Sequence, residues 1–225
     1  MAILTFKLNQ NLFLRDPQNT ELGQKIITKS VNMIEALGFE LFTFKKLAEE
    51  IDSTEASVYR YFENKHRLLL YLIDLYWTWL DYRLDFEVNN VSDPEERMRK
   101  CLKVLTWDLK GNTQIAFVND ETLQHIVMTE FEKTYLTKQV DTDNKDGLFL
   151  PYKGVCKKIA AIILEINPTY RFPHSLASTA LLAFTHQIYY AKHLPSLSDI
   201  KYDAKNNNKK LYEFLEGLLL TTIRK

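Results

Sequence analysis

Glycine and proline are scarce in this sequence, with only 6 of each among 225 residues. Turn-rich β folds need these residues at their tight turns, so the scarcity favours long uninterrupted helices. The length suffices for one large domain or two small ones. The chain is 46% hydrophobic and 26% charged, which is ordinary for a globular protein with a hydrophobic core.

Cysteine is also scarce, and neither sign of charge is in excess. Cys101 and Cys156 lie far apart and in no CxxC spacing, which argues against a disulfide framework and a zinc site. We therefore expect a protein of the reducing cytoplasm. The formal net charge is +0, so a nucleic acid partner is not indicated by total charge and must be argued from local charge.

Long apolar runs are absent as well. No stretch reaches the roughly 18 apolar residues that can span a bilayer. The opening residues, MAILTFKLNQ, lack the basic region and long apolar run of a signal peptide. We expect neither a membrane partner nor a secreted protein.

Helical periodicity dominates what is present. Apolar residues recur at intervals of three and four from residue 22 to 37, which predicts a helix with Thr20 as N-cap and Gly38 at its end. Thr43 and Thr54 are expected to cap two short helices, and Asn64 a long one that ends near residue 88. Further helices are expected at about 94–110, 113–139, 152–166, 173–193 and 209–224, with polar loops at 141–151 and 196–208. The sequence therefore predicts an all-α fold of roughly nine or ten helices.

The segment before these helices reads differently. Residues 5–15 alternate between apolar and polar side chains, which predicts a small hairpin or an extended arm. Such an arm either contacts DNA or packs on the first helix, and we favour the packing.

Two short helices joined by a tight turn at Asp52 and Ser53, with a longer helix beside them, form a helix-turn-helix. The second short helix enters a DNA major groove, so its inner side must pack on the first and its outer side must be polar. Val58 and Phe62 are expected to face inward, beside Leu47, Ala48 and Ile51. The residues left for the groove and its rims are Thr54, Glu55, Ser57, Tyr59, Arg60 and Tyr61. A tyrosine hydroxyl can reach a phosphate while its ring stays packed, and Lys65 brings a cation and a helix N-terminus to the DNA backbone.

The stretch FTFKKLAEEIDSTEASVYRYFENKHRLL, residues 42–69, resembles the DNA-binding domain of TetR-type transcriptional repressors. The matching elements are the Thr43 cap, Leu47-Ala48, the run Tyr59-Arg60-Tyr61-Phe62, and Lys65 with Leu68. The match is dense from about residue 20 to 70, and the remainder matches in helical layout and length. A helical hairpin in some unrelated bundle is the alternative interpretation of residues 43–62.

The resemblance implies a homodimer that binds a palindromic double-stranded DNA operator, usually as a repressor. It implies an N-terminal arm at 1–19, a DNA-binding domain at 20–68, and a ligand-binding and dimerisation domain at 69–225. A small-molecule effector in the larger domain would move the fourth helix and spread the two DNA-reading heads. By position, Thr43, Tyr59 and Lys65 would hold phosphates, and Thr54, Glu55 and Ser57 would lie near base edges. The complete set of DNA-binding candidates is Thr43, Lys46, Thr54, Glu55, Ser57, Tyr59, Arg60, Tyr61 and Lys65.

The sequence departs from the family pattern in the turn and in charge. Asp52 stands where the family usually has glycine, and aspartate tolerates the left-handed conformation better than most residues. Ser53 stands where valine is usual. Residues 42–70 hold five lysines and arginines (45, 46, 60, 65, 67) and five acids (49, 50, 52, 55, 63), so nonspecific DNA binding should be weak. We expect Glu49 and Glu50 to pair with Lys45 and Lys46. Glu55 either accepts from a cytosine amino group or pairs with Lys65 or Arg60.

The last two long helices are the candidates for a dimer interface. They offer apolar surface at Leu181, Leu182, Phe184, Ile188, Leu211, Phe214, Leu215 and Leu218. The alternative is that all of this surface is core within one chain.

Aromatic residues beside polar groups are the candidates for an effector pocket. They are Trp107, His125, Met128, Phe131, Tyr135, His186, Tyr189 and Tyr190. The alternative is that these are core residues, because a chain with 12 Tyr and 13 Phe must bury most of its rings.

An enzyme is the least supported class. The sequence shows no paired acids, no Ser-His-Asp order and no glycine-rich loop for phosphate, and the histidines lack metal-ligand spacing. We expect no cofactor and no metal. The rival to a DNA-binding regulator is a helical small-molecule-binding or interaction protein that does not bind DNA, which the neutral head supports.

Overall fold

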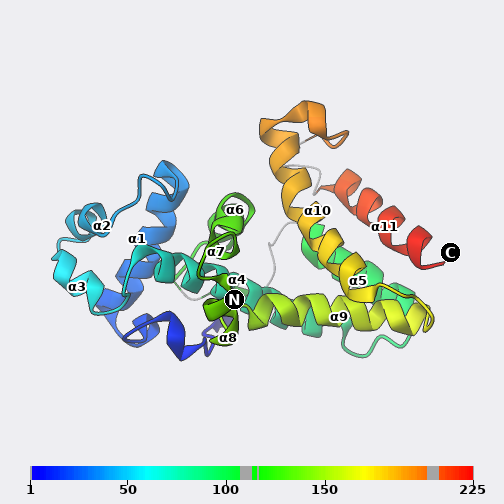
Figure 1. Ribbon diagram of the computed structural model, residues 1–225, viewed down its shortest axis with the longest axis horizontal. Helices are drawn as coiled ribbons and strands as arrows, with labels where there is room; N and C mark the ends of the chain where they lie inside the picture. Colours follow the sequence, from blue (N-terminus) through cyan, green and yellow to red (C-terminus); the bar gives the residue numbers. More distant parts are fainter. Residues whose placement is uncertain (1, 107–112, 116, 202–207, 225) are drawn as a thin grey trace. The chain divides into compact units, whose positions relative to one another are not determined.

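The computed structural model describes residues 2–106, 113–115, 117–201 and 208–224. Trp107, one of the pocket candidates, lies outside these ranges. The described chain is mainly helical, as the sequence predicted, and it has eleven α-helices where nine or ten were expected (Figure 1). They are α1 (Glu21–Leu37), α2 (Phe44–Glu50), α3 (Glu55–Tyr59), α4 (Lys65–Val88), α5 (Pro94–Thr106), α6 (Asp120–Glu130), α7 (Glu132–Tyr135), α8 (Val140–Lys145), α9 (Leu150–Ile166), α10 (Pro173–His193) and α11 (Lys209–Ile223). Short 3-10 helices are η1 (Gln10–Leu12), η2 (Pro17–Asn19) and η3 (Pro195–Leu197).

Two compact units make up the chain. The first holds Met1–Trp79 and Gly111–Leu150, and the second holds Leu80–Lys110 and Pro151–Lys225. The first unit therefore contains the expected DNA-binding segment together with α6, α7 and α8. Helix α4 begins in the first unit and ends in the second. No helix in the described ranges combines the length and the apolar character needed to cross a bilayer.

The core of the first unit is built around the start of α4. Every residue of α4 from Leu68 to Trp77 is buried, so this part of the helix is covered on all sides and shows no polar stripe. Aromatic rings fill the contacts, with Phe62 5.4 Å from Tyr71 and Trp77 5.5 Å from Phe131 between ring centroids. Helices α1 and α6 pack against each other in the same unit.

The second unit packs α10 and α5 against α11. Leu211, Leu215 and Leu219 of α11 are fully buried, at the spacing of four that places residues on one helix face. Surface ion pairs join the elements as well: Arg99 of α5 contacts Glu216 of α11 at 2.9 Å, and Glu95 of α5 contacts Arg224, which follows α11, at 2.5 Å. The inner face of α11 is therefore committed to packing within the chain.

The N-terminal arm forms no hairpin over residues 5–15, contrary to the first of the two expected forms. The Asn9 side chain accepts a hydrogen bond from the Asn11 backbone amide at 2.9 Å and starts η1. The extended strand β1 (Ala2–Leu4) lies earlier and pairs in parallel with β2 (Thr113–Ile115). The arm also packs on α1, since a Cβ at Gly23 would lie 2.3 Å from the Pro17 carbonyl oxygen.

Residues 113–151 also differ from the prediction of one helix followed by a loop. The Asn119 side chain accepts from the Thr122 amide at 2.9 Å and caps α6, so the helix begins at Asp120 and not near 113. The polar stretch 141–151, expected to be a loop, contains α8 and the start of α9. No side-chain cap starts α8, and its lone buried residue, Asp143, makes contacts outside the helix. Local sequence signals therefore could not predict it.

Asp74 of α4 is a buried carboxyl group, with 4% of the residue exposed. Its Oδ1 atom has no hydrogen-bond partner among the described residues, and burial raises its pKa from 3.8 to about 7. Between these two values an unfolded chain loses this proton while the folded chain keeps it. Folding stability therefore falls as pH rises through this window and then levels off.

We predict that Asp74→Asn removes this penalty, because asparagine is neutral at every pH. At pH 8 the variant should exceed the wild type in free energy of unfolding by up to about 4 kcal/mol. At pH 3.5 the two should agree. Urea unfolding across this range measures the difference, with Asp52→Asn on the surface as the control. A constant offset between the Asp74→Asn and wild-type curves at all pH values would contradict the assignment.

Candidate nucleic-acid interface

Three threonine caps define the helices of the head, by which we mean α1, α2 and α3. The Thr20, Thr43 and Thr54 hydroxyls accept from the backbone amides three residues ahead at 3.0, 3.3 and 3.2 Å. Each cap residue has extended backbone angles, which stops the preceding chain from continuing as helix. All three predicted caps are confirmed.

The turn between α2 and α3 depends on Asp52. Its φ of +51° lies in the left-handed region, where glycine is most at ease and aspartate is tolerated. The next residue closes the turn, since the Ser53 amide donates to the Ala48 carbonyl at 2.9 Å. The expectation that aspartate can replace glycine here is confirmed.

The inner face of the head is also as predicted. Val58, Phe62 and Leu47 are fully buried, and Ile51 is 2% exposed. These side chains fix the angle at which α3 crosses α2, so the outer side of α3 is presented at a defined orientation.

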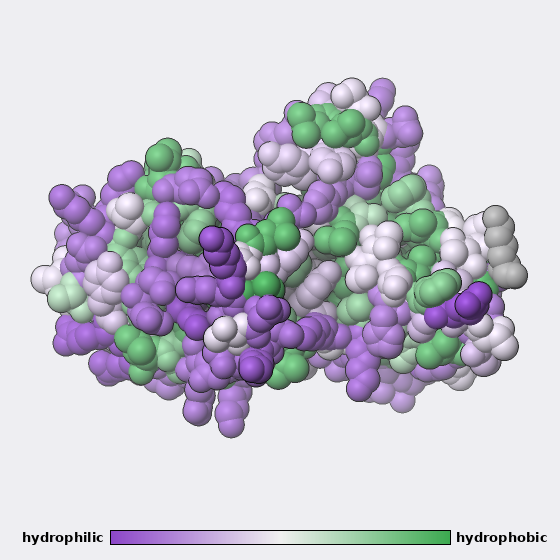
Figure 2. Space-filling model, in the orientation of Figure 1, coloured by the Kyte–Doolittle hydropathy of each residue, from purple (hydrophilic) through white to green (hydrophobic). Residues whose placement is uncertain are grey.

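The outer side of α3 carries exposed polar residues. Thr54, Glu55, Tyr59 and Arg60 are exposed, and we call these four residues the α3 face. Tyr59 is 46% exposed although its ring packs edge-on against Phe44 at 5.0 Å. This packed ring with an exposed edge matches the arrangement expected of a tyrosine that reaches a phosphate. Two further candidates, the N-cap Thr43 and Lys46 of α2, are also exposed. The visible surface over α2 is mainly hydrophilic (Figure 2).

Two of the candidate residues are not on the outer side. Tyr61 is 2% exposed, and its hydroxyl lies 2.8 Å from the Thr20 hydroxyl at the start of α1. Ser57 is 8% exposed, with its hydroxyl 2.9 Å from the Thr54 hydroxyl and accepting from Arg60 at 2.8 Å. Ser57 lies in α3 and Tyr61 in the turn that follows it, and both side chains face inward. Ser57 orients Arg60, and Tyr61 joins this turn to the start of α1.

Lys65 is bound to the head itself. Its ammonium donates to the carbonyl oxygens of Phe39, Glu40 and Phe42 at 3.0, 3.2 and 3.2 Å, and it lies 4.6 Å from the centre of the Phe39 ring. An ammonium has three N–H donors, so all of them are used. These bonds tie α4 to the loop that joins α1 to α2, and they compete with the phosphate contact that the sequence predicts for Lys65.

The acids of α2 also pair differently from the prediction. Glu50 contacts Lys29 of α1 at 2.9 Å, and this lysine lowers the pKa of Glu50. Lys46 instead donates to the Leu41 carbonyl at 2.9 Å. A tertiary contact to α1 and a bond to the preceding loop thus replace the expected pair of Glu50 with Lys46. Glu55 makes no ion pair with any described residue, and both partners considered for it, Lys65 and Arg60, are engaged elsewhere.

A second set of contacts, from α6 and α7, holds the same loop. The buried Glu130 side chain accepts from the Phe39 amide at 3.2 Å and contacts Lys133 at 2.7 Å. Lys133 also contacts Glu40 at 3.0 Å. Sequence reasoning missed these residues, because nothing local to α6 indicates a partner about 90 positions earlier in the chain.

The effector-pocket candidates fall into both units. His125, Met128, Phe131 and Tyr135 belong to the first, where Phe131 is buried between Trp77 and Tyr135 at 5.5 and 5.0 Å and His125 contacts Glu35. His186, Tyr189 and Tyr190 follow one another along α10 in the second. No group of three or more His, Cys, Asp or Glu in the described ranges is placed to hold a metal ion.

Most of the dimer candidates are core residues of the second unit. Leu181, Phe184 and Leu211 are at most 1% exposed and Ile188 is 9% exposed, so they give no free apolar surface. The reason is that α10 and α11 bury their facing sides against each other. Phe214 is 45% exposed and Leu182 37%, Leu218 is partly exposed, and a Cβ at Gly217 would meet nothing within 4 Å. These residues mark the outer side of the two helices.

Residues 26–72 match the family model described as "Bacterial regulatory proteins, tetR family". A comparison with curated protein sequences gives no match.

Solved structures share the fold. AibR, in complex with isovaleryl coenzyme A and operator DNA, is 15% identical with a TM-score of 0.59, covering 87% of this chain and 97% of its own. The fatty acid degradation regulator FadR from Bacillus halodurans is 16% identical with a TM-score of 0.59, covering 86% and 93%. A TetR-family regulator from Syntrophomonas wolfei is 14% identical with a TM-score of 0.63, covering 90% and 94%.

We predict that Lys65→Met destabilises the protein by about 1–3 kcal/mol, because three carbonyl groups lose their charged donor. Lys45→Met removes an exposed lysine of α2 and should change stability by less than about 0.5 kcal/mol. Thermal unfolding of both variants measures the effect. Equal melting temperatures for the two variants would show that the Lys65 contacts do not stabilise the head.

Proposed function

We propose that the chain is a sequence-specific DNA-binding transcriptional regulator of the tetR type, which the match of residues 26–72 to the tetR family model supports. In this proposal it acts in the cytoplasm as a repressor that a small-molecule effector releases from its operator. The observation that carries the proposal is the α3 face, a polar surface held at a fixed angle by a buried inner side. No catalytic step, metal or cofactor forms part of it.

The α3 face fits a major groove in its chemistry. Thr54 and Glu55 stand at the start of α3, which is where recognition helices contact base edges. Tyr59 offers a hydroxyl to a phosphate from a packed ring, and Arg60 is oriented by Ser57 at 2.8 Å. Thr43 and Lys46 of α2 supply further contacts to the DNA backbone. In this arrangement Tyr61 and Lys65 support the helix and do not touch DNA.

The surroundings of Glu55 favour a contact with a DNA base over an ion pair within the chain. It is exposed and has no cationic partner among the described residues, and a carboxylate in the major groove accepts from a cytosine amino group. The equal number of acids and bases in residues 42–70 means that attraction to phosphates in general is weak. Specific contacts must therefore supply most of the affinity.

The rival function is a helical small-molecule-binding or interaction protein that does not bind DNA. The neutral head favours it. Selection of duplexes from a random pool, followed by a salt titration of the winner, separates the two. A regulator enriches a pseudo-palindromic sequence whose affinity falls as salt is added, whereas the rival enriches nothing.

A homodimer is required for a palindromic operator, because two heads must sit one helical turn apart on the same face of DNA. We propose that the outer sides of α10 and α11 join two copies of the chain. Phe214, Leu182 and Leu218 supply apolar contact there, and Gly217 lets the partner's backbone approach closely. The remainder of each helix is already packed within its own chain.

The effector is proposed to bind among the aromatic candidates. AibR was solved with both an acyl coenzyme A and operator DNA, so a protein of this fold accommodates both kinds of partner. In this chain the two candidate groups are His125 with Met128, Phe131 and Tyr135, and His186 with Tyr189 and Tyr190. We propose that residues 20–68 form the DNA-binding domain and that residues 69–225 bind the effector and the second copy of the chain.

We predict that Tyr59→Phe lowers affinity for the selected duplex roughly fivefold per head, the equivalent of one hydrogen bond of about 1 kcal/mol. The loss should be similar for mismatched duplexes, because a phosphate contact carries no sequence information. Fluorescence anisotropy measures both affinities. Tyr82→Phe, on the second half of α4, should bind as the wild type does. A loss confined to one sequence would contradict a phosphate contact.

We predict that Phe214→Glu converts the dimer to a monomer, since a carboxylate cannot be desolvated in an apolar interface without a partner. Sedimentation equilibrium at micromolar concentration measures the mass. Phe172→Glu replaces a phenylalanine that is 59% exposed and should leave the dimer intact. A dimer that survives Phe214→Glu would place the interface elsewhere.

A further inference from the structure

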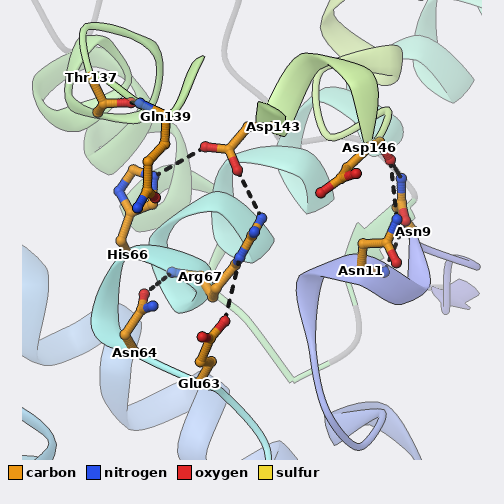
Figure 3. A network of polar contacts seen from close by, with 10 residues as sticks. All are labelled: Asn9, Asn11, Glu63, Asn64, His66, Arg67, Thr137, Gln139, Asp143 and Asp146. Carbon is orange, nitrogen blue, oxygen red and sulfur yellow. Dashed lines mark hydrogen bonds and ion pairs between the residues drawn. The ribbon is translucent and has the colours of Figure 1, made fainter. Parts of the chain in front are cut away.

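Asp143 is the buried acid of α8, with a side chain that is 1% exposed. Figure 3 shows it between two side chains from the first turn of α4. Its Oδ1 atom lies 3.0 Å from an Arg67 guanidinium nitrogen, and its Oδ2 atom lies 3.7 Å from His66 Nε2. Both partners are themselves largely covered, at 18% and 23% exposure.

The charge on Asp143 depends on these partners. A carboxylate removed from water is strongly destabilising unless a cation compensates it. Burial lowers the pKa of His66, and the nearby Asp143 only partly opposes this effect. His66 is therefore mainly neutral near pH 7, and the permanent cation at this site is Arg67. The Asp143–Arg67 pair is the contact that the buried acid requires.

The first turn of α4 is bound on two sides. Lys65 donates to three carbonyls of the loop between α1 and α2, while His66 and Arg67 face α8. Arg67 is further fixed at its backbone, whose amide donates to the Asn64 side chain at 2.9 Å. Its guanidinium also lies 4.0 Å from Glu63. Helix α3 ends at Tyr59, only a few residues before this turn, so a fixed first turn of α4 limits where the end of α3 can lie.

Helix α8 is anchored at its other end. The Leu148 amide donates back to the Asp143 carbonyl at 3.0 Å. The Asn9 and Asn11 side-chain amides donate to the Asp146 carbonyl at 2.8 and 3.3 Å (Figure 3). A short helix without a capping side chain is thereby held between the N-terminal arm and α4, within one compact unit.

We propose that Asp143 is a positioning residue for DNA binding, acting through Arg67 on the corner between α3 and α4. This inference rests on the proposed function of the α3 face. Asp143 does not touch DNA. It holds the first turn of α4 on the side opposite to Lys65, so that the α3 face keeps one orientation. A protein that lacks the carboxylate should remain folded but present α3 less rigidly.

The test is Asp143→Asn, which keeps the shape of the side chain and removes its charge. Affinity for the selected duplex should fall about tenfold, in the range of coupling effects between packed elements. The slope of affinity against salt should stay unchanged, because the phosphate contacts are the same in number. In the free protein, amide hydrogen exchange of residues 57–62 should become faster. Glu50→Gln, which breaks an exposed pair in the same unit, is the control and should alter neither reading.

The two readings separate the inference from the function on which it rests. A wild-type protein that binds no duplex overturns the proposed function, while the exchange measurement still reports on Asp143. Unchanged exchange at residues 57–62 in folded Asp143→Asn overturns the inference, as does unchanged affinity where the wild type binds. If Asp143→Asn does not fold, Arg67→Lys replaces it. This variant keeps the positive charge but loses the planar guanidinium. Its affinity for the selected duplex should fall about threefold, and amide exchange of residues 57–62 should become about threefold faster. If neither quantity changes, the inference is overturned.

Discussion

The arrangement of the head depends on the first turn of α4. Lys65 uses its three donors on the carbonyls of Phe39, Glu40 and Phe42, and so closes the loop between α1 and α2 onto the helix that follows α3. The carbonyl groups of a loop need hydrogen-bond donors from outside it, and here a single charged donor satisfies three carbonyl groups at once. Val58 and Phe62 then pack against elements whose positions are fixed, and this packing sets the orientation of the α3 face.

The head is neutral in formal charge, and part of its positive charge is used in contacts within the chain. Of the five cations in residues 42–70, Lys65 donates to three carbonyls and Arg67 is paired with Asp143. The other three, Lys45, Lys46 and Arg60, are few to attract phosphates without specificity. A head of this composition gains affinity only where its hydroxyls, Arg60 and Glu55 meet matching groups. Precise placement of α3 therefore matters more here than it does for a strongly basic head.

Sequence alone sufficed for the features that local chemistry decides. The caps at Thr20, Thr43 and Thr54, the left-handed turn at Asp52 and the inward face of α3 depend on neighbours within a few residues. Contacts between distant parts of the chain were not predictable. Tyr61 is buried because Thr20 lies beside its hydroxyl, and α8 forms in a polar stretch because Asp143 meets Arg67. For the same reason, periodicity identified the apolar residues of α10 and α11 but could not say which of them pack within one chain.

The central claim is that the α3 face lies against duplex DNA, and amide hydrogen exchange with and without a selected duplex tests it most directly. The account predicts slower exchange on DNA binding at residues 54–60 of α3, with residues 173–193 of α10 unchanged. If the duplex binds and exchange throughout residues 43–62 stays the same, the head does not read DNA and the account is wrong.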